Sequence, residues 1–278
     1  DKKIVFTEKS FAAPFEVIAD AGNSRVLRFA PPFANGMNAS LVLGQAVFTT
    51  AADAASQSGM FDPEGLAFDA GGDLWVADSS NNRVLRFQPP FANGMIAAAV
   101  LGQADFAASG VAVTQGGMDY PTDVSFDGSG NLWVTDLGNS RVVEFIPPFL
   151  TGMNSSKVLG QPNFTNSLPA VTQSGMKFPF KSAFDAAGNL WVAGFAANRV
   201  TKYIPPFSDG MNASLVLGQA NFTSGGAGLG RSGLNNTAGV SFDAAGNLWV
   251  SDAGNGRIVK FLVGGSLALA ADIAGSGA

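Results

Sequence analysis

The chain has 278 residues and a formal net charge of −5, with 46% hydrophobic and 13% charged residues, which excludes a disordered chain and allows a sizeable core. It contains no cysteine and no histidine, which excludes disulfides, thiolate metal sites, the Ser-His-Asp triad and Cys-His nucleophile pairs. The basic residues are scattered singly and no apolar run reaches the length that spans a bilayer, so we expect neither a nucleic-acid partner nor a membrane span.

The first elements in chain order are less regular than the later ones. Residues Lys3–Phe6 are predicted to form a strand, Glu16–Asp20 a second, and Arg25–Phe29 a third, with a longer loop between the first two. A start at Asp1 without methionine or an apolar leader is typical of a mature secreted protein, and equally of a trimmed chain.

The third of these strands opens a repeat. Similar five-residue segments begin at Arg25, Arg83, Arg141, Arg199 and Arg257, each 58 residues after the one before. Leu-Gly-Gln recurs with the same period at 43–45, 101–103, 159–161 and 217–219, and Leu-Trp-Val at 74–76, 132–134, 190–192 and 248–250. Three markers with one period indicate five copies of one unit, with approximate limits 1–58, 59–116, 117–174, 175–232 and 233–278.

Each copy is predicted to hold four short strands. In the second copy these are Gly65–Asp69, Asp73–Asp78, Arg83–Phe87 and about Ala98–Gln103. The first strand recurs at Asp123–Asp127, Lys181–Asp185 and Gly239–Asp243, and an Asp-x-x-Gly-Asn/Asp turn follows it. In the last copy, which lacks Pro-Pro-Phe and Leu-Gly-Gln, the fourth strand is predicted at Asp272–Gly275.

The first, second and fourth strands of a copy are nearly continuously apolar or small, as happens when neighbouring sheets cover both faces. Four-stranded sheets repeated in this way predict an all-β chain that forms a β-propeller of five blades, with residues 1–278 in one domain. Whether five blades close a ring alone, or with a sixth from outside this chain, stays open.

The repeated pattern Phe-Asp-x-x-Gly-Asn-Leu-Trp-Val-x-Asp-x-x-Asn-x-Arg-Val-x-x-Phe resembles the NHL repeat. The resemblance covers nearly the whole chain and implies a propeller with a central channel that binds proteins, glycans or, in some members, RNA. Family propellers most often have six blades, whereas five copies are counted here. The period also exceeds the roughly 40–45 residues of a compact blade, so we expect enlarged loops on the rims.

The repeated acidic residues have two interpretations. Asp20, Asp78, Asp136 and Asp252 stand five residues before the repeated arginines and are either metal ligands or partners that bridge strands, and we favour bridging. Gly194 replaces this residue in the fourth copy, so Arg199 or a neighbour should lack one partner. Asp69, Asp127, Asp185 and Asp243 are predicted to cap turns, because each turn supplies one carboxylate and calcium needs several.

Function is expected where the copies disagree, just before the first strand of each blade. The predicted ligand-binding residues converge at one mouth of the channel, where charged and aromatic side chains would meet in a concave site. The alternative is that these loops drift freely and that Asp123 and Lys181 form an ordinary ion pair between blades. The predicted set is Phe61, Glu64, Asp119, Tyr120, Asp123, Lys177, Phe178, Phe180, Lys181 and Asn235.

Asn-x-Ser/Thr sequons at Asn38, Asn154 and Asn212 occupy one repeat position in the Pro-Pro-Phe loop. They are candidate glycosylation sites in a secreted protein, although copying of an Asn-rich loop explains the same pattern.

Three functions compete. The first is a non-catalytic extracellular scaffold, secreted or on the cell surface, that binds a protein or glycan without a cofactor, a metal or catalytic residues. The second is a subunit that polymerises with itself into a filament or surface layer by exchanging its terminal strand. The third is a lactonase-like hydrolase with a divalent ion held by Asp62, Glu64, Asp119 and Asp123. Of these we expect the scaffold, and not an enzyme.

Overall fold

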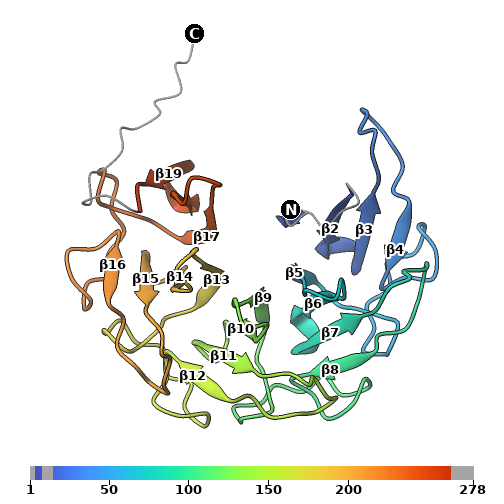
Figure 1. Ribbon diagram of the computed structural model, residues 1–278, viewed down its shortest axis with the longest axis horizontal. Helices are drawn as coiled ribbons and strands as arrows, with labels where there is room; N and C mark the ends of the chain where they lie inside the picture. The colour runs from blue at the N-terminus through green and yellow to red at the C-terminus, as the bar shows by residue number, and fades with distance from the viewer. Residues whose placement is uncertain (1–3, 8–14, 264–278) are drawn as a thin grey trace. The chain divides into compact units, whose positions relative to one another are not determined.

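The computed structural model describes residues 4–7 and 15–263 of the chain, and these residues form strands, turns and three short 3₁₀ helices (Figure 1). The helices are η1 (Ala21–Asn23), η2 (Ser79–Asn81) and η3 (Ala253–Asn255). None of the helices within these ranges has the length and hydropathy needed to cross a membrane.

The strands form five antiparallel sheets, each made of strands that follow one another in the chain, and we call these sheets blades 1 to 5. Blade 1 consists of β1 (Ile4–Thr7), β2 (Glu16–Asp20), β3 (Arg25–Phe29) and β4 (Leu41–Leu43). Blade 2 consists of β5 (Pro63–Phe68), β6 (Leu74–Asp78), β7 (Arg83–Phe87) and β8 (Ala99–Leu101). Blade 3 consists of β9 (Pro121–Phe126), β10 (Leu132–Asp136), β11 (Arg141–Phe145) and β12 (Lys157–Leu159).

Blade 4 consists of β13 (Pro179–Phe184), β14 (Leu190–Gly194), β15 (Arg199–Tyr203) and β16 (Leu215–Leu217). Within the described residues blade 5 has three strands, β17 (Thr237–Phe242), β18 (Leu248–Asp252) and β19 (Arg257–Phe261). The predicted all-β fold of five β-propeller blades is confirmed.

The predicted strand limits are close to the observed ones. The second strand of blade 1 and the third strands of all blades match residue for residue, whereas the first strands of blades 2 to 5 begin two residues earlier than predicted. Lys3 of the first predicted strand, and the predicted strand Asp272–Gly275, lie outside the described residues.

The chain divides into two compact units, and each is described by itself. The first runs to Asn139 and also takes in Val143–Lys157 and Phe164–Asn166. The second comprises Ser140–Val142, Val158–Asn163 and the residues from Ser167 onward. Blades 1 and 2 therefore lie in the first unit and blades 4 and 5 in the second. The prediction of a single domain stays a prediction.

Apolar packing between consecutive blades forms the core of each unit. In the first unit Val17 and Val26 of blade 1 belong to one buried cluster with Leu74, Val76 and Leu85 of blade 2. We call the blade face that carries Val17 and Val26 the leading face and the opposite face, which carries Leu74, Val76 and Leu85, the trailing face.

The second unit repeats this packing. Trp191 and Val200, on the leading face of blade 4, cluster with Leu248 and Val250, on the trailing face of blade 5. In both units a leading face is thus buried against the trailing face of the next blade, which is why the strands read as apolar on both sides.

The turn between the first two strands of a blade is capped as predicted. In blade 2 the Oδ1 atom of Asp69 accepts hydrogen bonds from the backbone nitrogens of Gly71 and Asp73, at 2.9 and 3.0 Å. Its Oδ2 atom accepts from the indole nitrogen of Trp75 at 3.0 Å. The turn aspartate therefore fixes both the hairpin and the tryptophan that fills the leading face.

Candidate binding site

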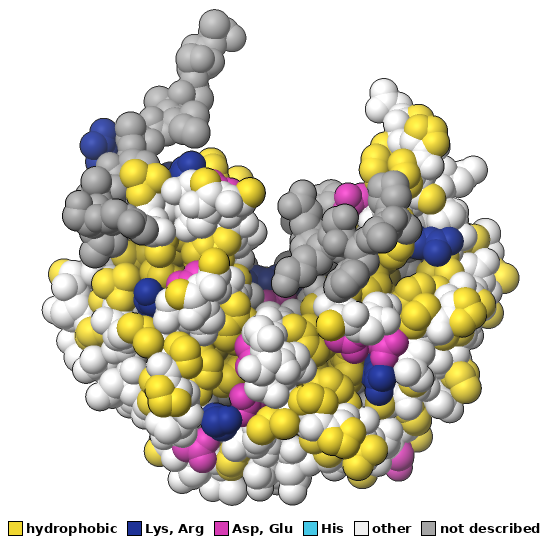
Figure 2. Space-filling model, in the orientation of Figure 1, with side chains coloured by type: hydrophobic (Ala, Val, Ile, Leu, Met, Phe, Trp, Pro, Cys, Tyr) yellow, Lys and Arg dark blue, Asp and Glu magenta, His cyan; other side chains and the backbone are white. Residues whose placement is uncertain are grey.

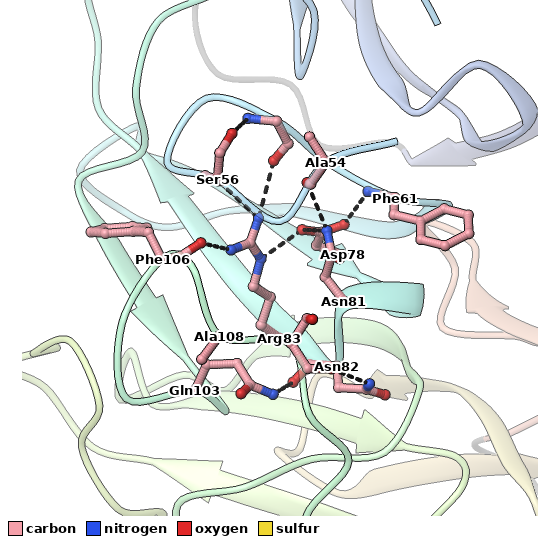
Figure 3. Close-up of polar contacts among 12 residues, drawn as sticks. Ala54, Ser56, Phe61, Asp78, Asn81, Asn82, Arg83, Gln103, Phe106 and Ala108 are labelled. Atoms are coloured by element: carbon pink, nitrogen blue, oxygen red, sulfur yellow. Dashed lines mark hydrogen bonds and ion pairs between the residues drawn. The ribbon is translucent and has the colours of Figure 1, made fainter. Parts of the chain in front are cut away.

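Arg83 lies at the centre of a buried polar network in blade 2 (Figure 3). Its Nε atom donates to Oδ2 of Asp78 at 2.7 Å, and both side chains are fully buried. Asp78 also accepts from the side chain of Asn81 at 2.9 Å and from the backbone nitrogen of Phe61 at 2.6 Å. The guanidinium donates further to three backbone carbonyls, those of Ser56, Gly59 and Phe106.

The same carboxylate therefore ties strands together and fixes the residue that leads into β5, the first or inner strand of its own blade. Arg25–Asp20 in blade 1 and Arg257–Asp252 in blade 5 repeat the ion pair at 2.7 Å. The bridging interpretation of these aspartates is the one that the geometry supports. Because both oxygens of the Asp78 carboxylate already accept from protein donors, this network holds the blade and does not bind a ligand.

Blade 4 lacks this carboxylate. Gly194 stands in place of the aspartate and Ala197 in place of the asparagine. The guanidinium of Arg199 donates to the carbonyls of Phe222, Thr172 and Gly175, at 2.5, 2.8 and 2.9 Å. Burial lowers the pKa of Arg199. In the fourth copy it is therefore Arg199 itself, and not a neighbour, that lacks the carboxylate partner.

The inner strands of blades 2 to 5 begin with an unusual backbone. The first residue of each of the strands β5, β9, β13 and β17 is followed by a shift in the pairing register with the second strand. The residue just before each of these strands has a left-handed φ although it is not glycine. Such a conformation is strained for an ordinary side chain and is found at functional sites. The bulge redirects the side chain that follows. The left-handed residues are Asp62, Tyr120, Phe178 and Asn236, with φ of 55°, 51°, 49° and 49°.

In the first unit these strand starts bring a phenol and two carboxylates together. The hydroxyl of Tyr120 donates to Oδ2 of Asp62 at 2.5 Å and lies 3.4 Å from Oε1 of Glu64. Asp62 and Tyr120 are half-buried, whereas Glu64 is buried. Asp62 and Tyr120 hold the same position in successive repeats, so equivalent residues of neighbouring blades touch.

Two further contacts hold this group in place. The backbone nitrogen of Tyr120 donates to the side chain of Asn82, in blade 2, at 2.8 Å. Gly65 lies so close to β9 that a Cβ atom there would be 2.5 Å from Cα of Asp123. The inner strands β5 and β9 therefore pack backbone to backbone, which fixes the spacing between Asp62 and Tyr120.

Burial, the hydrogen bond to Asp62 and the charges of Glu64 and Asp62 raise the pKa of Tyr120. The phenol therefore stays protonated well above neutral pH and donates a hydrogen bond to Asp62. Burial also raises the pKa of Asp119, whose carboxylate lies over the backbone of Gly138. The backbone nitrogen of Asp119 donates to Asp136 at 2.7 Å, so this residue is held by its own blade.

In the second unit the strand start of blade 4 is aromatic and basic. The rings of Phe180 and Phe195 have centroids 5.8 Å apart, and Lys177, Phe178 and Lys181 are half-buried beside them in sequence. Asn235 resembles Asp119, because its backbone nitrogen donates to Asp252 at 2.6 Å and its side chain lies over Gly254.

The predicted site residues thus fall into two sets. Phe61, Glu64, Asp119, Tyr120 and Asp123 lie in the first unit, and Lys177, Phe178, Phe180, Lys181 and Asn235 in the second. That all ten share one channel mouth stays a prediction. The predicted set omitted Asp62 and Asn82, which hold Tyr120. The 58-residue separation between Asp62 and Tyr120 was the signal for the first of them.

Charged side chains are dispersed among apolar ones on the face shown in Figure 2. Within residues 4–7 and 15–263, no three acidic side chains are grouped as ligands of a metal ion.

The NHL-repeat family model matches residues 62–87 and 118–145, which hold the first three strands of blades 2 and 3. Blades 2 and 3 carry NHL repeats. No curated protein matches this NHL-repeat chain in sequence at a significant level.

Solved structures share the fold of the NHL-repeat chain. Virginiamycin B lyase from Staphylococcus aureus aligns over 93% of this chain and 66% of its own length, with a TM-score of 0.54 and 12% identity. A Bacteroides uniformis protein provisionally named 6-phosphogluconolactonase aligns over 91% and 64%, with a TM-score of 0.55 and 12% identity. A chain of the nidogen–laminin complex aligns over 93% and 75%, with a TM-score of 0.59 and 17% identity. This chain therefore spans about two thirds of the length of the virginiamycin B lyase and of the Bacteroides uniformis protein.

The prediction that the chain is not an enzyme is wrong. It took uniform repeats and the lack of histidine and cysteine as evidence against catalysis, but this propeller fold is also that of proteins named as a lyase and a lactonase. At 12% identity these likenesses concern the fold alone. The function has to be argued from the residues of the site.

Proposed function

We propose that this NHL-repeat chain is an interaction protein that recognises a partner through the strand starts of blades 2 and 3. The observation that carries the proposal is the group formed by Tyr120 and Asp62, whose oxygen atoms are 2.5 Å apart beside buried Glu64. The blades repeat most of their strand residues, whereas the residues at the strand starts differ from blade to blade. A binding site needs unlike groups in one place, and this position supplies them.

The chemistry of the group favours a basic side chain of a protein partner. Asp62 and Glu64 supply negative charge, and the phenol of Tyr120 orients the Asp62 carboxylate. Because Glu64 is buried, its charge is weakly screened and acts strongly on a cation that comes close. A guanidinium or ammonium group would gain charge-assisted hydrogen bonds from this arrangement.

The test is a calorimetric titration with two probes, N-acetylarginine amide and N-acetyllysine amide. We expect the wild type to bind at least one probe, Asp62→Asn to lose binding, and Tyr120→Phe to weaken it. Asp105→Asn changes an exposed aspartate in a loop and serves as the control that binds as the wild type does. Failure of both probes to bind, or binding that Asp62→Asn leaves unchanged, would refute the proposal. Binding of neutral oligosaccharides instead would indicate a glycan partner.

A catalytic role for the same residues is the second candidate. The short hydrogen bond between Tyr120 and Asp62 pairs a proton donor with a carboxylate base, the two groups that ring opening of a cyclic ester requires. The observation fits the name of the Bacteroides uniformis protein that shares the fold, a lactonase. Hydrolysis of a set of lactones by the wild type, abolished in Tyr120→Phe and retained in Asp105→Asn, would establish it.

An extracellular location belongs to the same proposal. The side chains of Asn38, Asn154 and Asn212 are exposed in their loops, as glycosylation requires. The intact mass of the protein from its natural source, before and after enzymatic deglycosylation, tests this modification.

A further inference from the structure

The leading face of blade 5 is exposed where the same face of other blades is buried. Ile258 on this face has 69% of its surface exposed. The residues at its repeat position in the other blades have none exposed: Val26, Val84, Val142 and Val200. Trp249 on the same face is half-buried, whereas Trp75, Trp133 and Trp191 are buried. Blade 5 therefore presents an apolar face of the kind that elsewhere packs against a blade.

The trailing face of blade 1 is exposed in the complementary way. Ile18 and Leu27 on this face are half-buried, although Val76 and Leu85, at the same positions in blade 2, are completely buried. Phe33 in the Pro-Pro-Phe loop is 55% exposed. A trailing face is thus available at one end of the chain and a leading face at the other.

The contacts between consecutive blades inside each unit, which we call joints, show what a leading face packs against. In the first unit the leading-face Trp75 of blade 2 contacts Phe149, from the Pro-Pro-Phe loop of blade 3, with ring centroids 4.6 Å apart. In the second unit Trp191 of blade 4 contacts Phe242 of blade 5 at 6.0 Å. A leading face is therefore covered by aromatic and aliphatic side chains of a trailing face of this same repeat.

We propose that the leading face of blade 5 binds the trailing face of blade 1 in a second copy of this chain. In this joint Phe33 of the second copy lies against Trp249 as Phe149 lies against Trp75. Each copy offers one face of each kind, so the contact is heterologous and copies add head to tail.

Charge supports the pairing of these two ends. Glu16 is exposed on the trailing face of blade 1, at a position that is leucine in blades 2 to 5. Lys260, on the leading face of blade 5, lies 5.1 Å from the ring centroid of Trp249 and 3.4 Å from Asp243 of its own blade, so Glu16 would be a second carboxylate beside its ammonium group. In the second unit the leucine equivalent to Glu16, Leu248, clusters with Trp191. By the same geometry Glu16 would approach Trp249 and Lys260, and an opposite charge meets it there.

The proposed joint differs from exchange of a terminal strand. The strand β1 pairs with β2 of its own chain, from Ile4 opposite Asp20 to Thr7 opposite Val17. Self-association therefore needs no strand to leave its blade, and it uses the faces that stack blades within the chain.

Sedimentation velocity of the full chain across a wide concentration range tests the proposal. We expect the mass of the wild type to grow with concentration, and acrylamide quenching of Trp249 to fall in parallel. Ile258→Glu removes the leading face and Phe33→Glu the trailing face, and each should weaken association on the order of thirtyfold or more, as a charge in a central apolar contact does. Leu168→Glu alters a residue that is 73% exposed in a loop and should associate as the wild type does.

Mixing the two variants gives the decisive result. The Phe33→Glu chain keeps its leading face and the Ile258→Glu chain keeps its trailing face, so the mixture should form dimers and nothing larger. A wild type that stays monomeric, or a mixture that forms no dimer, would overturn the proposal. If the wild type is monomeric and Ile258→Glu lowers the melting temperature while Leu168→Glu does not, the two faces join within one chain and a second copy is not the partner.

Discussion

Blade 4 should become more stable when Gly194 is replaced by aspartate. In blades 1, 2 and 5 the corresponding aspartate accepts the Nε hydrogen of the repeated arginine at 2.7 Å. Arg199 is only 2% exposed, and its guanidinium donates to backbone carbonyls. Its desolvation cost is therefore already present in the folded chain, without the carboxylate that offsets it elsewhere.

Three effects of Gly194→Asp raise the free energy of unfolding, and two lower it. A hydrogen bond to a charged group contributes about 1.5–3 kcal/mol, and an acceptor for the backbone nitrogen of Lys177 about 1 kcal/mol. Replacing glycine, whose φ here is not left-handed, contributes roughly 0.5 kcal/mol through the unfolded state. Against these, burial of the new carboxylate costs several kcal/mol, and its Cβ would lie 3.1 Å from Cβ of Ala197. We expect a net stabilisation of about 1–2 kcal/mol.

A second substitution rebuilds the complete network. In blade 2 the amide of Asn81 donates to Asp78 at 2.9 Å and to the carbonyl of Ala54 at 3.0 Å. Combined with Gly194→Asp, Ala197→Asn restores this donor beside the introduced carboxylate and should add roughly 1 kcal/mol. Ala197→Asn alone buries an amide without the carboxylate that would accept from it, and should not stabilise the chain.

Urea unfolding at neutral pH, followed by circular dichroism, measures these effects through the midpoint at constant slope. Gly128→Asp is the matched control, because Gly128 is exposed, has no left-handed φ and has nothing within 4 Å of its would-be Cβ. The control should change stability by less than about 0.5 kcal/mol. Midpoints at or below that of the wild type for both the single and the double variant would refute the reasoning.

Two pH effects follow from other groups. Burial raises the pKa of both tyrosines, Tyr120 and Tyr203, so tyrosinate absorbance should stay absent from the folded chain above about pH 10. Stability should fall as pH rises beyond that value, and Asp62→Asn should lower the titration midpoint of Tyr120. Hydrogen bonds from Asn247 and Trp249 hold the pKa of Asp243 well below its usual range. Its contribution is therefore present above about pH 4 and lost below it, and Asp243→Asn should flatten the acid side of the melting-temperature profile.

The repeat made most of the fold predictable. The third strand of every blade begins at an arginine, and these arginines recur every 58 residues. The period therefore placed that strand correctly in all five blades. The role of Asp78 and its equivalents followed as well, because a carboxylate five residues before an arginine, across a hairpin, faces it directly. The lack of a partner in blade 4 could be predicted from Gly194 alone.

The starts of the inner strands could not be placed from the pattern. Asp62, Tyr120 and Phe178 have a left-handed φ that is normally taken by glycine or asparagine. Two of them are aromatic, so neither propensity nor turn chemistry indicates the bulge that follows. In blade 2 the strand start also packs Gly65 against Asp123, a contact between blades that a single repeat does not contain.

The same dependence on neighbours explains why the ends of the chain differ from its middle. A blade buries each of its faces against a neighbouring blade, and among the faces that the structure describes the trailing face of blade 1 and the leading face of blade 5 are the exposed ones. If these faces served no purpose, charged residues would be expected across both of them. Ile258 and Trp249 instead remain apolar, and only the edge position Glu16 departs from leucine, opposite the charge that Lys260 supplies. This pattern is what the proposed joint requires, and in that joint Glu16 takes the place of the leucine found in the internal ones.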